Sequence, residues 1–186
     1  MPDLALVDRS LLASWAALAQ RAPGARMRPA GWQQTEWTRA MAADLTSIPT
    51  WRGMGAGVER LAEPAELFAL NGATADLLDG WPPAARGFVL RDGGQVLSGA
   101  LAFHLDGDCE IGFVATAPAA RRRGLARRLL AALLADAVAA GCTSATLHAT
   151  AVAEPLYARA GFRDLGRMVE LSPPRWMNGA GASSHT

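Results

Sequence analysis

The chain has 186 residues, of which 51% are hydrophobic and 19% are charged, and its formal net charge is +1. This length and apolar content predict one folded domain and exclude wholesale disorder. The near-neutral charge also argues against a protein that binds nucleic acid through bulk electrostatics.

The composition narrows the class of protein further. No apolar run approaches the roughly 18 residues of a membrane span, and no secretory signal is visible at the N-terminus. Cys109 and Cys142 are too few for a disulfide framework or a Cys-rich zinc site. We therefore expect a reduced, cytoplasmic protein with no membrane partner and no metal. All basic residues are arginine, which we interpret as the mark of a GC-rich bacterial genome and which excludes Schiff-base lysine chemistry.

The N-terminal part of the chain is predicted to be helical. Apolar residues at helical spacing run to Ala19, and a second short helix is suggested by Trp32, Trp37, Met41 and Leu45. We therefore expect residues 1–45 to form a helical extension packed on the same domain. Residues 46–172 would form that domain, and residues 173–186 a flexible tail.

The remaining elements alternate between strands and helices. Residues 51–61 are expected to form a glycine-weakened strand and residues 63–78 a helix. The elements expected next are strands at 87–90, 95–105 and 109–115, a helix at 124–140, a strand at 143–150, a helix at 153–160 and a strand at 162–171. This order predicts an α/β (α+β) domain with a mixed, mostly antiparallel sheet flanked by helices. The long helix is a crossover, so the strands on either side of it should run parallel.

The most informative segment joins the third of these strands to the long helix. Arg121, Arg122 and Arg123 precede Gly124, which opens the helix. The first turn of a helix offers unpaired N–H groups and a positive dipole end, and glycine lets a ligand approach the backbone. The segment therefore predicts an anion site, for which a diphosphate-bearing cofactor is the natural ligand.

Two motifs carry a family resemblance. Arg121-x-x-Gly124-x-Ala126 resembles the Arg/Gln-x-x-Gly-x-Gly/Ala signature of the GNAT N-acetyltransferase superfamily, and residues 155–162 resemble its Leu-Tyr-x-x-x-Gly-Phe motif. The resemblance covers about residues 86–171. It implies the GNAT-like acyl-CoA N-acyltransferase fold, acetyl-CoA as cosubstrate, and acetyl transfer to a primary amine of a small molecule or peptide by direct attack on the thioester.

The resemblance also implies a set of cofactor-binding residues. Backbone N–H groups of residues 122–127 would hold the CoA pyrophosphate. The strand that carries Val114 would separate from residues 147–150, and the pantetheine arm would lie in the gap. The amide of Val114 would point at the thioester carbonyl. The full set is Val114, Thr116, Arg121, Arg122, Arg123, Gly124, Ala126, Arg127 and Thr150, the last standing where many members have asparagine.

Two residues are candidates for acid and base. Tyr157, the single tyrosine, falls on the motif position where many members keep the general acid. Glu110 lies eleven residues before Arg121, as does the base of the histone-type members. On a strand, Glu110 would share a face with Gly112 and Val114. The alternatives are a packed helix aromatic for Tyr157, and a solvating charge for Glu110 with a water chain as base.

Other interpretations of the chain stay open. The alternative function is a non-catalytic CoA-binding or regulatory module of the same fold. A third interpretation is that the arginine-rich residues 121–128 form a patch that binds nucleic acid. His104 and His148 are interpreted as packed or surface residues of strands, with a catalytic role as the alternative. Two roles are open for Trp32, Trp37, Trp51 and Trp81. They would line an aromatic site for the acceptor, or they would attach the N-terminal part of the chain to the sheet. Exposed sheet edges leave a homodimer possible.

Overall fold

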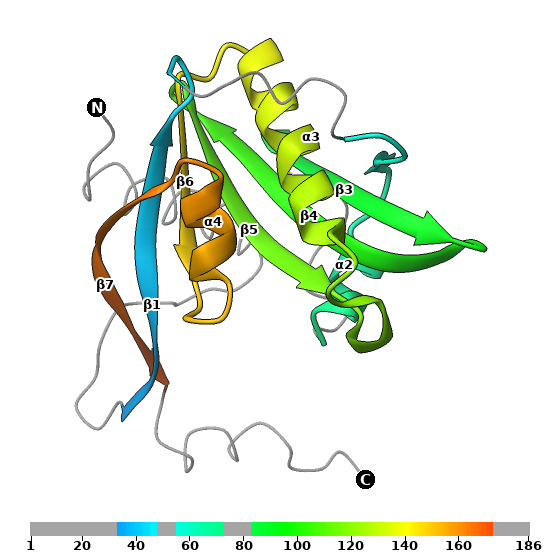
Figure 1. The fold of residues 1–186 in the computed structure, drawn as a ribbon, viewed down its shortest axis with the longest axis horizontal. Coiled ribbons are helices and arrows are strands. Elements are labelled where there is room, and N and C mark those ends of the chain that lie inside the picture. Colours follow the sequence, from blue (N-terminus) through cyan, green and yellow to red (C-terminus); the bar gives the residue numbers. More distant parts are fainter. Residues whose placement is uncertain (1–32, 48–54, 73–82, 173–186) are drawn as a thin grey trace, which may run out of the picture.

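The computed structural model describes residues 33–47, 55–72 and 83–172. In these residues seven strands form one sheet in the order β2-β3-β4-β5-β6-β1-β7 (Figure 1). The strands are β1 (Gln33–Asp44), β2 (Glu59–Leu61), β3 (Ala85–Asp92), β4 (Gln95–Leu105), β5 (Asp108–Thr116), β6 (Ser144–Ala149) and β7 (Arg163–Ser172). Only β5 and β6 pair in parallel among the described strands. The predicted mixed, mostly antiparallel sheet is thus confirmed.

Helices cover both faces of the sheet. The described helices are α2 (Ala65–Leu70), α3 (Leu125–Ala139) and α4 (Glu154–Arg159), with a short 3-10 turn at Pro118–Ala120. In Figure 1, α3 and α4 lie in front of the sheet. Leu67 of α2 packs instead with Leu101 and Phe103 of β4, which point away from α3. None of the described helices has the length and hydropathy needed to cross a membrane.

The first strand corrects a sequence prediction. Residues 33–44 form β1 rather than a helix, and β1 lies between β6 and β7, antiparallel to both. The predicted helix rested on Trp32, Trp37, Met41 and Leu45, of which the last three are spaced four residues apart. A spacing of four fits one helix face, but it is also even, so it fits one strand face equally well. Met41 indeed faces the side of α3, whereas Ala40 faces the other side.

The described part of the expected N-terminal extension is therefore a strand of the sheet. Because β1 is an interior strand of the sheet, the described part of the expected helical extension belongs to the domain itself. Residues 1–32 and the expected tail at 173–186 lie outside the described residues. Of the helix expected at 63–78, Ala65–Leu70 is confirmed and residues 73–78 lie outside the described residues. Of the strand expected at 51–61, Glu59–Leu61 is confirmed and residues 51–54 lie outside the described residues.

Helix α3 supplies more buried residues to the core on its side of the sheet than any other described element. Its predicted apolar stripe is confirmed, and the buried members are Leu125, Leu129, Leu130, Leu133, Leu134 and Ala137. Val138, which we expected in the stripe, is 54% exposed because it falls beyond the edge of the buried arc. Both cysteines are buried, as expected of small apolar fillers.

Candidate functional site

The two parallel strands separate along their length. β5 and β6 pair only from Asp108 with Ser144 to Ile111 with Leu147. β5 continues to Thr116, and Figure 1 shows it diverging from β6 toward the carboxyl ends of both strands. The predicted separation of these strands is therefore present, and it opens just after Ile111.

A buried carboxylate joins the two strands at the closed end of this split. Asp108 is 1% exposed and accepts hydrogen bonds from the hydroxyls of Ser144 and Thr146, each at 2.6 Å. Both donors lie on β6, so one side chain of β5 holds two residues of its neighbour. Two hydrogen bonds to a buried carboxylate offset the free energy that its removal from water costs. This network holds the two strands together within the paired stretch, and no sequence pattern predicted it.

A bulge interrupts β5 beyond the split. Phe113 and Val114 together face the single residue Ala100 of β4. Phe113 has a φ of 51°, which is unusual for a residue with a side chain. The extra residue reverses the alternation of side chains, so Val114 packs toward α3 and Phe113 toward the opposite face.

The bulge corrects one sequence prediction. We expected Glu110, Gly112 and Val114 to share a face, because alternate residues of a regular strand do. Glu110 alternates with Ile111, which packs on the α3 side, so Glu110 faces away from α3 whereas Val114 faces toward it. The inserted residue between them accounts for the difference.

The segment after β5 forms an open, positively charged turn. Arg122 and Gly124 both have left-handed backbone conformations, with φ values of 65° and 77°. No side-chain cap is bonded to the described N-terminus of α3, and its first turn carries no acidic residue. A Cβ on Gly124 would meet no atom within 4 Å, so the space in front of the helix is open. These features fit a diphosphate.

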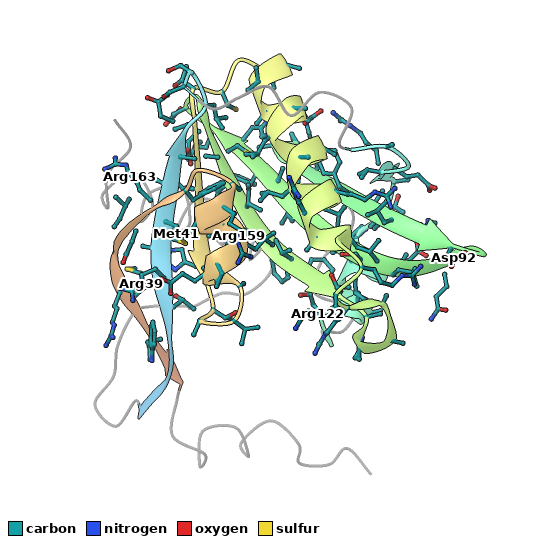
Figure 2. The ribbon with its side chains drawn as sticks, viewed as in Figure 1. Arg39, Met41, Asp92, Arg122, Arg159 and Arg163 are labelled. Carbon is teal, nitrogen blue, oxygen red and sulfur yellow. The ribbon has the colours of Figure 1, made fainter. Side chains whose placement is uncertain are left out.

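The predicted cofactor residues are distributed around this turn. Arg122 lies in the loop between β5 and α3 (Figure 2). The exposed members of the set at this turn are Arg121, Arg122, Arg123, Gly124 and Arg127, and Ala126 is half-buried. The Nε of Arg121 donates to the carbonyl of Thr116 at 3.2 Å, and the Thr116 hydroxyl lies 2.7 Å from that of Ser98 on β4. The structure thus brings the arginines to one end of α3.

Tyr157 lies on α4, on the same side of the sheet as α3. Its side chain is 4% exposed, and its ring makes an edge contact with Phe162 at 5.9 Å between centroids. Burial raises the pKa of Tyr157 to about 12. The phenol therefore stays protonated at neutral pH and keeps a proton to donate.

The raised pKa predicts a loss of stability in strong alkali. The folded state holds the Tyr157 proton more tightly than the unfolded state, whose pKa is near 10. Folding stability should therefore be full below pH 10 and fall by about 3 kcal/mol as the pH rises to about 12. Because the chain has one tyrosine, phenolate absorbance measures this group alone. In Tyr157→Phe this part of the alkaline loss should disappear, whereas the part that the buried Cys109 thiol contributes through its own raised pKa should remain. A phenol that titrates near pH 10 in the folded protein would contradict the assignment.

Glu110 is buried on the opposite face. Its side chain is 4% exposed, and its backbone pairs with Thr146 of β6. A Cβ on Gly112 would lie 3.4 Å from Oε1 of Glu110, so the carboxylate lies over Gly112 where β5 leaves β6. Tyr157 and Glu110 therefore lie on opposite faces of the sheet.

The other polar residues named from the sequence have identifiable contacts. Thr150 is exposed, and its carbonyl accepts the N–H groups of Ala153 and Glu154 at 2.9 and 3.0 Å, which starts α4. His148 Nδ1 lies 3.2 Å from the Thr38 hydroxyl. Burial lowers the pKa of His104.

Within residues 33–47, 55–72 and 83–172, no group of three His, Cys, Asp or Glu side chains could hold a metal ion.

The tryptophan predictions are only partly within the described residues. Trp37 lies on β1, and the guanidinium groups of Arg39 and Arg167 lie 5.6 and 4.5 Å from its ring centroid. These contacts tie β1 to β7. Trp32, Trp51 and Trp81 lie outside the described residues.

Sequence reasoning did not find the contacts between the end of α2 and the bulge of β5. Asn71, which ends α2, donates from Nδ2 to the carbonyl of Phe113 at 3.0 Å. Phe68 of the same helix makes an edge contact with the ring of Phe113. An Asn-Gly pair is a recognisable helix end, but a contact between residues 71 and 113 leaves no local sequence signal.

Comparisons with known proteins agree with this geometry. A family model described as "Acetyltransferase (GNAT) family" matches residues 56–162. No curated protein matches the chain. Among solved structures, a chain described as an acetyltransferase of the GNAT family from Novosphingobium aromaticivorans has a TM-score of 0.61 and 23% identity, over 82% of this chain and 72% of that one.

Two further solved structures are similar. A GCN5-related N-acetyltransferase from Kribbella flavida has a TM-score of 0.57 and 23% identity, over 77% of this chain and 60% of that chain. One from Sphaerobacter thermophilus has a TM-score of 0.57 and 22% identity, over 75% of this chain and 51% of that chain. The chain thus spans between about half and three quarters of the length of these three relatives.

The structural likenesses establish the fold, and the family match extends over more than half of the chain. The matched segment includes the bulged strand, the arginine-rich turn and α4 with Tyr157. The chain therefore belongs to the acetyltransferase (GNAT) family.

Proposed function

We propose that the protein is an acetyl-CoA-dependent N-acetyltransferase that moves an acetyl group to a primary amine of a small molecule or peptide. The observation that carries this proposal is the end of β5–β6 pairing at Ile111 and Leu147. The free end of β5 leads directly into an uncapped helix N-terminus surrounded by arginines. A strand with an unpaired edge next to an anion site suits a ligand that carries both amides and phosphates.

The turn before α3 would hold the pyrophosphate of acetyl-CoA. Its ligands would be the backbone N–H groups of residues 122–127, with the guanidinium groups of the neighbouring arginines adding charge. The open space at Gly124 supports this placement. Each exposed charge at a helix N-terminus contributes roughly 0.3–1 kcal/mol. Micromolar affinity corresponds to about 8 kcal/mol, so these contacts would supply only a part of it and the pantetheine arm in the split would supply the rest.

The bulged part of β5 would stabilise the charge that develops in the reaction. When an amine attacks a thioester, negative charge grows on the carbonyl oxygen. A fixed N–H dipole aimed at that oxygen lowers the barrier without reorganising during the reaction. We assign this role to the amide of Val114, which follows the bulge residue Phe113. Thr116 and Thr150 would contact the cofactor from the two sides of the split.

Tyr157 and Glu110 would divide the proton transfers. The amine must lose a proton to attack, and the departing thiolate must gain one. Tyr157 is protonated at neutral pH because its pKa is about 12, so it is suited to protonate the thiolate. Glu110 approaches from the other face, where it could accept the proton of the amine, directly or through water.

Replacing Glu110 with glutamine tests the base. We expect kcat at neutral pH to fall on the order of hundredfold, because the amine must then lose its proton without a positioned base. The loss should shrink as the pH rises, since the free amine becomes abundant by itself. The measurement is kcat against pH, with Glu63→Gln on the exposed segment before α2 as the matched control. An unchanged kcat in Glu110→Gln would make a water chain the base.

Thiol release from acetyl-CoA with a panel of primary amines tests the function as a whole. An active transferase releases CoA faster when the right amine is present. Tight acetyl-CoA binding without release for any amine would favour the non-catalytic CoA-binding module instead.

A further inference from the structure

The end of α2 is bonded to the bulge of β5. The side-chain amide of Asn71 donates one hydrogen bond to the carbonyl of Phe113 at 3.0 Å and one to the carbonyl of Leu67 at 2.9 Å. The second bond closes the last turn of α2. The first reaches a strand 42 residues further along the chain. Asn71 therefore connects a helix terminus to the one irregular residue of β5.

The bulge needs support because its backbone is unfavourable. Phe113 has a φ of 51°, a conformation that an aromatic residue rarely adopts. Such conformations persist only where the surroundings fix them. Phe68 packs edge-on against the Phe113 ring at 5.1 Å and an interplanar angle of 89°. Together Asn71 and Phe68 hold Phe113 from the α2 side of the sheet.

The bond from Asn71 acts on a specific peptide group. The carbonyl of Phe113 and the N–H of Val114 belong to the same peptide. The described residues contain no cis peptide, so these two groups point in opposite directions. Fixing the carbonyl toward Asn71 fixes the N–H away from it. A hydrogen bond to the carbonyl also polarises the peptide and makes its N–H a better donor.

We propose that Asn71 is a positioning residue for acetyl transfer: it orients and polarises the Phe113–Val114 peptide so that the Val114 N–H stabilises the developing oxyanion. This inference rests on the proposed function, because it presumes that Val114 faces the thioester. Asn71 acts through that peptide and does not itself touch the substrate. The competing explanation is that Asn71 only closes α2.

Two variants of Asn71 remove the donor in different ways. Asn71→Asp keeps the shape but cannot donate at neutral pH, and Asn71→Leu removes the donor without adding charge. Asn71 is exposed, so both variants should fold. Gly72→Ala is the matched control, because Gly72 has a φ of 71° and alanine there strains the same helix end without touching Phe113.

The first readout separates binding from chemistry. In both Asn71 variants we expect kcat for thiol release to fall about tenfold, less than the 10²–10³ lost with a direct oxyanion donor. The Kd for acetyl-CoA should stay within about twofold, since the bond acts mainly in the transition state. Gly72→Ala should lower the Tm but keep kcat.

The second readout needs no acceptor. The probe is an unreactive analogue of acetyl-CoA with a methylene in place of sulfur, isotope-labelled at the carbonyl. Its infrared carbonyl stretch should shift to lower frequency on binding to the wild-type protein and to Gly72→Ala. The shift should be smaller in Asn71→Asp and Asn71→Leu.

The outcomes separate a failure of the proposed role of Asn71 from a failure of the proposed function. Asn71 variants that keep kcat and the carbonyl shift, and lose only Tm, would show that Asn71 merely closes α2. A wild-type protein that binds the analogue without any carbonyl shift would overturn the role of the Val114 amide while leaving the cofactor site intact. A folded wild-type protein that binds neither acetyl-CoA nor the analogue would reject the proposed function, and this inference with it.

Discussion

Gly124→Glu should weaken acetyl-CoA binding on the order of hundredfold, which corresponds to about 2.7 kcal/mol. The carboxylate would project into the open space before α3, where the pyrophosphate is expected, and would repel it. The protein should still fold. A negative charge at a helix N-terminus is favourable for the helix, and it partly offsets the strain of a side chain at a φ of 77°. Calorimetric titration with acetyl-CoA measures the effect.

Gly124→Gln is the matched control for this variant. Glutamine has the size and the backbone strain of glutamate but no charge. Its affinity should fall between those of the wild type and the glutamate variant, and the difference measures the electrostatic part. Wild-type affinity in Gly124→Glu would mean that the phosphates bind elsewhere.

Tyr157→Phe should lower kcat on the order of hundredfold and leave acetyl-CoA affinity nearly intact. Phenylalanine fills the same buried space and keeps the edge contact with Phe162, so stability should change little. What is lost is the one hydroxyl that we assign to protonate the thiolate. Steady-state kinetics with a reactive amine, together with the Kd and the Tm, separate these effects.

The question for Tyr157 is whether its hydroxyl donates a proton or its ring only packs in the core. The alternative interpretation makes it a packed aromatic of α4, and its burial is compatible with that. An unchanged kcat in Tyr157→Phe would favour packing and remove Tyr157 as the acid. A fall in both kcat and Tm would leave packing as the cause, and only the kinetic loss without a Tm change supports the acid.

The sequence predicted best where structure is local. The strands from β3 to β7 and helix α3 have strong patterns of alternation or helical spacing, and turns such as Asp92-Gly93 mark their ends. The arginine-rich turn was also predictable, because a glycine before a helix is itself the feature that forms an anion site. These elements determine where the split between β5 and β6 and the arginine-rich turn before α3 lie in the fold.

Two features could not be predicted, for different physical reasons. The strand β1 was mistaken for a helix because apolar residues four apart satisfy both periodicities, and only pairing with β6 and β7 decides between them. The bulge at Phe113 has no local sequence marker, yet it reverses every side chain beyond it. That reversal places Glu110 and Val114 on opposite faces of the sheet.

Calorimetric titration of the wild-type protein with acetyl-CoA, with desulfo-CoA and ATP as comparisons, tests the proposed cofactor site. We expect micromolar binding of acetyl-CoA and of desulfo-CoA, and much weaker binding of ATP, because the split between β5 and β6 suits the pantetheine arm that ATP lacks. A folded protein that binds none of them, or binds ATP as well as acetyl-CoA, would contradict the proposed site.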